Sequence, residues 1–229
     1  MKKIKFLTFG FFVTVVLNSY GQNNNSTDPL IYDEGVVING VKWATRNVDK
    51  PGTFAVNPED AGMFYQWNRK VGWSVTDPMI NSNGDADWDS SIPIGDTWEK
   101  PNDPCPAGWR VPTLDEIKTL FNLNVEWTTK NGMSGKRFID EATGNFIFLP
   151  AVNNRYSVDG MLSDANPIRA VTVNSDGTFS EDGSYGYYWS STAHEKYKSD
   201  AYFLIFRSGR TFWNGSYRHY GRSVRCIAE

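Results

Sequence analysis

Cys105 and Cys226 constrain this 229-residue chain more than any other feature, because they are its only cysteines. In an oxidising compartment an even number of cysteines favours a disulfide. A bridge between the two would span 121 residues and tie the end of the sequence to its middle. Two free buried thiols are the alternative. We expect no metal site, because these cysteines with His194 and His219 match no structural zinc spacing.

The first residues have the layout of a signal peptide, which places the chain in an oxidising compartment. A lysine-rich start precedes an apolar run, Phe6–Leu17, and the small residues Ser19 and Gly21 then flank a cleavage position. The run is shorter than the roughly 20 residues that cross a bilayer. We therefore expect cleavage of residues 1–21, a flexible linker at 22–34, and a periplasmic, cell-surface or extracellular protein without a membrane span.

Charge and composition limit the partners. Removing the leader, with its lysines at 2, 3 and 5, changes the formal net charge from −3 to −6. Such an acidic chain is a poor candidate for binding nucleic acid, which requires a basic surface. Aromatic residues make up 15% of the chain and include nine Trp, and exposed Trp and Tyr are what binding surfaces use.

The hydrophobic pattern predicts an α+β architecture with short strands, few helices and long loops. Asn39-Gly40 suits the tight turn of a hairpin over 36–44. Thr113 to Glu116 forms a capping box and predicts the clearest helix, and Asn57-Pro58 predicts a second, short one. Residues 76–104 are rich in turn formers and predict a long loop. Further extended segments are predicted at 63–67, 146–149, 170–179 (a hairpin), 187–191, 201–206 and 223–226.

The motifs of common enzymes are absent. The sequence has no His-Glu-x-x-His, no Gly-x-Ser-x-Gly and no phosphate-binding glycine loop. We therefore expect no catalysis and no cofactor. Two alternatives stay open: a hydrolase of cell-wall or dietary polysaccharide with two carboxylates in one cleft, and a structural surface component.

One acidic stretch invites comparison with calcium loops. Oxygen-bearing side chains alternate over residues 81–89, as oxygen ligation of calcium requires. However, Gly84 comes too early for the helix-loop-helix calcium motif and no Glu closes the loop. We expect a solvated turn region rather than a metal site.

The segment from Arg207 to Tyr220 is the most suggestive for binding, because it mixes Trp, Tyr, Arg and His with small polar residues. Such mixtures combine rigid aromatic anchors with adaptable hydrogen bonding. The alternative is a last hairpin whose aromatics are half in the core.

Five distinctive sequence segments occur in order at 63–70, 103–113, 148–151, 188–192 and 221–226. The second contains Cys-Pro-Ala-Gly-Trp-Arg-Val-Pro-Thr, which is long and specific, and the last, Gly-x-Ser-Val-Arg-Cys, is a second anchor. Together the segments resemble the Fibrobacter succinogenes major paralogous domain over about residues 35–228. One departure is Asn68, where the family usually has Gly.

The resemblance implies that residues 35–229 form an exported bacterial domain with a C-type-lectin-like fold. It is similar in architecture to the formylglycine-generating-enzyme group and to the hypervariable receptors of diversity-generating retroelements. In those receptors the ligand surface lies just before the final strand, which maps here to Trp213, Asn214, Ser216, Tyr217, Arg218, His219 and Tyr220. Formylglycine chemistry does not carry over, because it needs reactive thiols. Calcium-dependent sugar binding does not either, because its Glu-Pro-Asn or Gln-Pro-Asp motif is absent.

These observations predict a binding or adhesion module that recognises a protein or a glycan ligand without catalysis. Trp213 and Tyr217 would supply the apolar anchors of that surface. Arg218 and Asn214 would add directional hydrogen bonds to the ligand.

Overall fold

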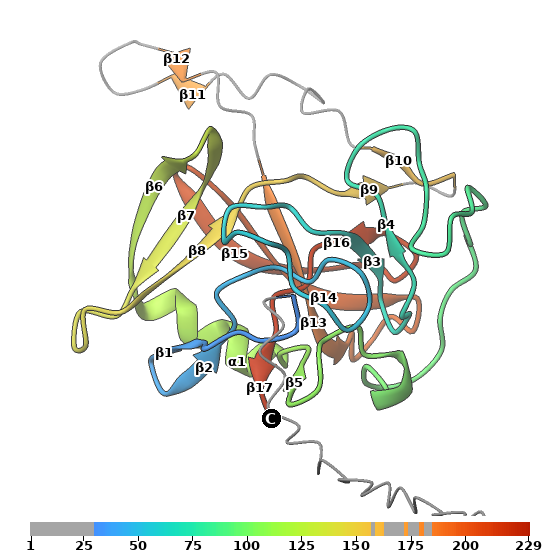
Figure 1. The fold of residues 1–229 in the computed structure, drawn as a ribbon, viewed down its shortest axis with the longest axis horizontal. Helices are drawn as coiled ribbons and strands as arrows, with labels where there is room; N and C mark the ends of the chain where they lie inside the picture. The colour runs from blue at the N-terminus through green and yellow to red at the C-terminus, as the bar shows by residue number, and fades with distance from the viewer. Residues whose placement is uncertain (1–29, 157–158, 163–171, 174–178, 181–184) are drawn as a thin grey trace, which may run out of the picture.

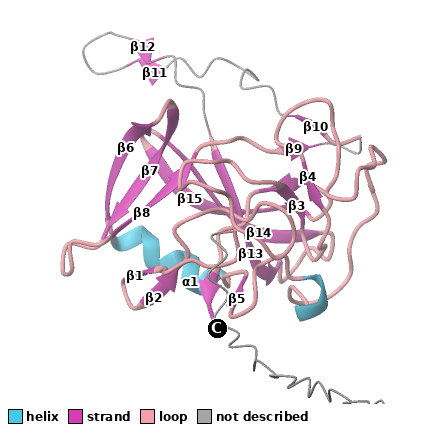
Figure 2. Ribbon diagram, in the orientation of Figure 1, coloured by secondary structure: helices cyan, strands magenta, loops and turns pink. Residues whose placement is uncertain are grey.

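The computed structural model describes residues 30–156, 159–162, 172–173, 179–180 and 185–229 (Figure 1). The expected signal peptide and most of the linker therefore lie outside the described residues. Strands and long loops dominate the fold (Figure 2). All pairings between strands in the described part of the chain are antiparallel, apart from two isolated parallel bridges. The α+β class is thus confirmed.

Two sheets bring distant parts of the sequence together. The first has the order β1 (Val36–Ile38), β2 (Val41–Trp43), β17 (Ile227–Ala228) and β5 (Trp109–Arg110). The second has the order β10 (Met161–Leu162), β9 (Arg155–Tyr156), β16 (Gly221–Arg222), β3 (Phe64–Gln66) and β4 (Gly72–Trp73).

The longer strands form two meanders. One contains β6 (Asn124–Lys130), β7 (Met133–Ile139) and β8 (Phe146–Pro150). The other contains β13 (Gly186–Ala193), β14 (Asp200–Arg207) and β15 (Arg210–Tyr217) and passes through the middle of the molecule (Figure 1). A small pair, β11 (Thr172–Val173) and β12 (Phe179–Ser180), falls in the hairpin predicted at 170–179, whose turn lies outside the described residues.

The predicted capping box is confirmed and starts the helix α1 (Leu114–Lys118). The Thr113 hydroxyl accepts from the Glu116 amide, and the Glu116 carboxylate accepts from the Thr113 amide at 2.7 Å. The helix continues as the 3-10 turn η2 (Thr119–Asn122) and buries Leu114, Ile117 and Leu120; a second 3-10 turn, η1 (Lys100–Asn102), ends the long loop.

The two turn predictions had different outcomes. Asn39 and Gly40 both have positive φ and join β1 to β2 as predicted. The helix predicted from Asn57 is wrong, because that segment forms a single turn closed by the Asp60 amide on the Asn57 carbonyl. Gly62, with φ +68, then redirects the chain within two residues, so no helix can propagate.

Residues 223–226 are extended but do not form the regular strand that was predicted. Ser223 bonds to the β13 backbone, whereas the Val224 and Cys226 carbonyls accept from Val48 and Ala44. The segment therefore changes partners along its length, which no sequence pattern records. The β6–β7 hairpin was not predicted, although its Asn131-Gly132 turn carries the same signal as Asn39-Gly40.

The predicted disulfide between Cys105 and Cys226 is confirmed, with 6.1 Å between the two Cα atoms. Cys226 is fully buried and Cys105 packs against the same hydrophobic cluster. The bridge joins the turn before β5 to the segment before β17. No helix among the described residues is long and apolar enough to cross a membrane.

Aromatic side chains form much of the core. Trp43, Trp67 and Trp189 are fully buried, and the indole N–H groups of the last two donate to the Ser190 and Tyr65 carbonyls. A buried indole N–H usually has such a partner, whereas that of Trp43 has none among the described residues. These contacts fix the central sheet against β3, so the hairpin that carries the candidate site stands on a rigid base.

Candidate functional site

The β14–β15 hairpin carries the segment that the sequence singled out for binding. The two strands pair along their whole length, from Asp200 opposite Tyr217 to Arg207 opposite Arg210. Among the described strands β15 lies at the edge of its sheet. Side chains along β15 therefore alternate between two faces, and both faces can be reached around the edge.

Two of the predicted residues are exposed aromatics on one face of β15. The side chain of Trp213 is 44% exposed and that of Tyr217 is 49% exposed. They lie four positions apart, so they project to the same side, as does Gly215 between them. Asn214 and Ser216 project to the opposite side. The structure thus brings Trp213 and Tyr217 to one surface and separates them from the two polar residues.

The last three predicted residues follow the strand and turn inward. His219 is buried and Tyr220 is half-buried. The Tyr217 ring stacks on His219 with 5.5 Å between centroids, and Tyr220 packs edge-on against both. Burial, with the charge of Arg69, lowers the pKa of His219, so its ring is neutral at pH 7. His219 and Tyr220 therefore pack against the Tyr217 ring and hold it in position.

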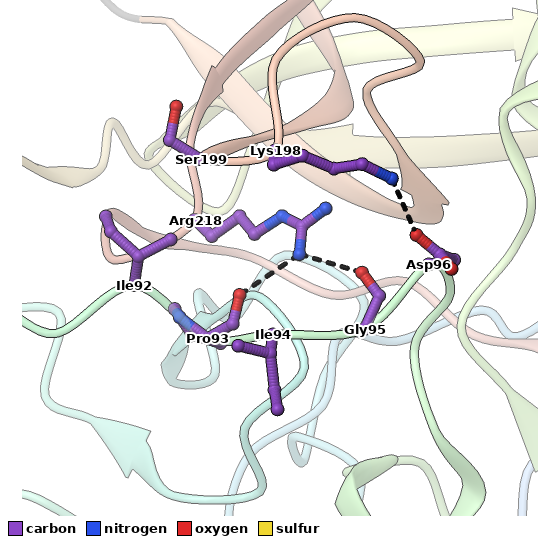
Figure 3. Close-up of a pocket in the computed structure, with 8 residues that line it drawn as sticks. All are labelled: Ile92, Pro93, Ile94, Gly95, Asp96, Lys198, Ser199 and Arg218. Atoms are coloured by element: carbon purple, nitrogen blue, oxygen red, sulfur yellow. Dashed lines mark hydrogen bonds and ion pairs between the residues drawn. The ribbon is translucent and has the colours of Figure 1, made fainter.

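Arg218 is buried and its guanidinium binds backbone. Its Nε donates to the Asp200 carbonyl at 3.0 Å, and its Nη1 donates to the carbonyls of Pro93 and Gly95 at 3.0 and 2.8 Å (Figure 3). The guanidinium carbon also lies 4.2 Å from the Trp67 ring centroid. The sequence predicted that Arg218 would donate hydrogen bonds to a ligand. Most of its N–H groups instead bind backbone carbonyls and hold the 93–95 loop against the end of β15.

A row of four rings continues from Trp213 across the sheet, and we call it the aromatic strip: Trp213, Tyr202, His194 and Tyr197. Neighbouring ring centroids along this row are 5.3, 4.7 and 4.9 Å apart. Tyr202 is mostly buried, whereas Tyr197 at the far end is 51% exposed. At the near end the Lys118 ammonium lies 5.4 Å from the Trp213 ring centroid. The strip therefore has exposed rings at both ends and a buried ring, Tyr202, between them.

Gly215 makes room for the strip. A Cβ at this position would lie 2.4 Å from Cδ2 of His194, closer than atoms can pack. Because Gly215 stands opposite Tyr202 in the strand register, the missing side chain lets the His194 ring cross β15 and stack on Tyr202. The sequence did not indicate Tyr197, His194 or Tyr202. Only the register of β14 on β15 brings them to Trp213.

The hydrogen bonds of His194 fix its tautomer. Its Nδ1 accepts from the amides of Lys196 and Tyr197 at 3.1 and 3.2 Å. When a neutral imidazole accepts at Nδ1, its proton is on Nε2. His194 therefore presents an N–H donor within a row of aromatic faces, the combination of directional and apolar contact that a binding surface requires.

No cluster of His, Cys, Asp or Glu in the described part of the chain is arranged to hold a metal ion. In the stretch 81–89, the Asn81 side-chain oxygen accepts from the amides of Asn83 and Asp85, and Asp89 pairs with Arg69. Asn81 thus caps its own turn, and Asp89 forms an ion pair.

A buried lysine attaches the site hairpin to the β6–β8 sheet. The Lys136 ammonium on β7 donates to the Arg210 carbonyl at 3.2 Å and to the Thr211 hydroxyl at 2.9 Å. Burial lowers the pKa of Lys136 to about 8 from its ordinary 10.5. Between pH 8 and 10.5 the unfolded chain therefore binds this proton more tightly than the folded protein does.

The stability of the protein is consequently expected to rise with pH across this window. The Lys136 contribution is at most about 3–4 kcal/mol, because each pKa unit corresponds to about 1.4 kcal/mol. Urea unfolding at a series of pH values measures it, as the difference between the wild type and Lys136→Met. The exposed Lys50→Met serves as the control. Parallel curves for wild type and Lys136→Met would show that the buried ammonium has no shifted pKa.

Comparisons with protein-family models, with curated proteins and with solved structures find no match for this chain. The function is therefore argued from the arrangement of the side chains themselves.

Proposed function

We propose that this chain is an exported binding module that engages a glycan through the aromatic strip and Tyr217. The observation that carries the proposal is the row of four contacting rings whose ends, Trp213 and Tyr197, are exposed. Exposed Trp and Tyr provide large apolar contact area at a low cost in conformational entropy. The rings form a single row with exposed ends, an arrangement that suits a chain-like ligand better than the broad desolvated core of a protein interface.

The proposed fold and the proposed position of the binding surface rest on the sequence. The leader supports export, and the five matching segments support membership of the Fibrobacter succinogenes major paralogous domain family with its C-type-lectin-like fold. The short helix, the long loops and the single disulfide are compatible with that assignment. The candidate surface lies before the closing segment, where the resemblance places it.

The polysaccharide hydrolase is a less well supported alternative. The cavity between the 92–96 loop and the turn before β14 has one carboxylate, Asp96, among its lining residues. Glycoside hydrolysis by the usual mechanism requires two carboxylates flanking one bond.

Replacing Trp213 by Ala is expected to weaken glycan binding about 30-fold, because an aromatic anchor contributes about 2 kcal/mol. The chain without its leader would be screened on a glycan array and a protein array, followed by calorimetry with the best ligand. Tyr197→Ala is expected to show a similar loss from the other end of the strip.

The matched control is Phe146→Ala, since Phe146 on β8 is an aromatic of similar exposure, 47%, on another sheet. Equal losses from Trp213→Ala and Phe146→Ala, or none from either, would contradict the proposed site. A hit confined to the protein array that Trp213→Ala abolishes would retain the site and replace the glycan by a protein ligand.

A further inference from the structure

Three arginines of the described chain are almost fully buried and make no ion pair: Arg218, Arg222 and Arg225. A buried charge is normally paired, because removing it from water is costly. Arg222 lies among aromatic faces and Arg225 binds Asn47 and the Ala44 carbonyl. Arg218 differs from both because it lines a cavity.

That cavity, of about 460 Å³, lies between the 92–96 loop and the turn that precedes β14 (Figure 3). Ile92 and Ile94 contribute apolar surface, and Asp96, Lys198, Ser199 and Arg218 contribute polar groups. A cavity with an apolar wall and a few convergent polar groups is the usual form of a small-ligand site.

Nη2 of Arg218 is buried without a hydrogen-bond partner. The other guanidinium nitrogens bind the carbonyls of residues 93, 95 and 200, so Nη2 is the one donor left over. In Figure 3 it lies on the side of the guanidinium that faces Lys198. A ligand oxygen at this point would supply the missing partner, and a carboxylate would also pair the charge.

Lys198 lines the same cavity as Arg218 (Figure 3), and its side chain is free to move. Its side chain is 79% exposed and pairs with Asp96, itself 87% exposed, at 3.1 Å. Exposed pairs of this kind contribute about 0–1 kcal/mol, so breaking this one costs little. An incoming carboxylate can therefore take Asp96's place beside Lys198 while its second oxygen reaches Nη2.

The loop opposite is held in place before any ligand arrives. Asn68 donates to the Ile94 carbonyl at 2.9 Å and accepts from the Glu99 amide at 2.8 Å. Gly95 has φ +112, a conformation that side chains disfavour, and this turns its carbonyl to Arg218. Asn68 itself has φ +54, so it fills a left-handed position where the family it resembles has Gly, and its amide adds the loop contacts.

We propose that this cavity is a carboxylate-binding site, with Arg218 and Lys198 as the cationic partners and Ile92 and Ile94 as the apolar wall. An acidic sugar and the carboxyl end of a peptide share this chemistry. The cavity shares no residue with the aromatic strip, although Lys198 directly follows Tyr197, so different variants test the two proposals.

The test is an amide NMR titration of the chain without its leader at pH 7 and constant ionic strength. The probes are glucuronate, N-acetylglycine and, as the neutral control, methyl β-glucoside. We expect saturable shifts at Gly95, Asp96 and Ser199 with at least one carboxylate and none with the neutral sugar. Stronger binding of glucuronate identifies an acidic sugar, and stronger binding of N-acetylglycine identifies a peptide carboxyl group.

Variants then assign the two cations. The Lys198 side chain is exposed, so its removal should leave the fold intact. Lys198→Ala is expected to weaken carboxylate binding about 3- to 10-fold, as for the loss of an exposed charge contact. Asp96→Asn frees Lys198 and is expected to tighten binding. Arg218→Lys is expected to remove saturation, and Lys50→Ala is the neutral control. Absence of saturable shifts with both carboxylates, or unchanged affinity in Lys198→Ala, overturns the proposal.

Discussion

Replacing Cys105 by Ser is expected to lower the free energy of unfolding by about 2–4 kcal/mol, the usual contribution of a native disulfide. The bridge spans 121 residues, so its loss restores much conformational freedom to the unfolded chain. For a domain of this size the melting temperature should fall by roughly 5–15 °C. Scanning calorimetry of the wild type and the variant measures the change.

A reducing agent supplies the matched control. The wild type should lose about as much stability on reduction as Cys105→Ser loses by substitution, and the variant should not respond to the reductant. Oxidised and reduced wild type that melt together would show that the bridge does not stabilise the fold. If Cys105→Ser were much less stable than the reduced wild type, the extra loss would come from the serine hydroxyl packed beside the core and not from the missing bridge.

The features that the sequence predicted are those encoded within a few residues. The capping box of Thr113 and Glu116 and the hairpin turn at Asn39-Gly40 each depend on side chains that act on their own backbone. The pairing of Cys105 and Cys226 also needed no geometry, because the export expected from the sequence and an even number of cysteines together predict it. The failed helix at Asn57 carried a similar local signal, but the backbone reversal at Gly62 overrode it.

The candidate site was predicted only in part, because it depends on strand register and on burial. Trp213 and Tyr217 share a face by the period of two that a strand imposes, a rule that the sequence alone could have applied to Asn214 and Ser216. The partners Tyr202 and His194 come from the pairing of β14 with β15. The burial of Arg218 depends on the 93–95 loop, more than 120 positions away in the sequence.

Replacing Arg155 by Met is expected to destabilise the protein by about 3–5 kcal/mol, in the range for removing one member of a buried polar network. The Arg155 guanidinium donates to the carbonyls of Ser74, Gly160 and Thr76 at 2.8, 2.9 and 2.7 Å. Those bonds hold the loop after β4 against Gly160, which precedes β10. Met fills the volume but leaves the carbonyls without donors.

Arg155→Lys separates charge from geometry. A lysine keeps the charge but has no planar fork, so it cannot serve three divergent carbonyls from one group. We expect it to lose nearly as much stability as Arg155→Met, with faster proteolysis within residues 74–78. A Lys variant as stable as the wild type would mean that charge alone is required at this position.

Arg222→Met should behave differently, although Arg222 is buried to the same degree as Arg155. Its guanidinium carbon lies 3.4 Å from the Phe203 ring centroid and 4.3 Å from that of Trp189, and its Nε and Nη1 have no hydrogen-bond partner.

Burial lowers the pKa of Arg222 to about 9, which reflects the free-energy cost of keeping the charge in the core. Met removes that cost and loses only contacts with aromatic faces, worth about 0.5–2 kcal/mol. We therefore expect a change within about 1 kcal/mol in urea unfolding. Equal losses in Arg155→Met and Arg222→Met would show that hydrogen bonding to loop carbonyls is not what makes a buried arginine stabilising in this fold.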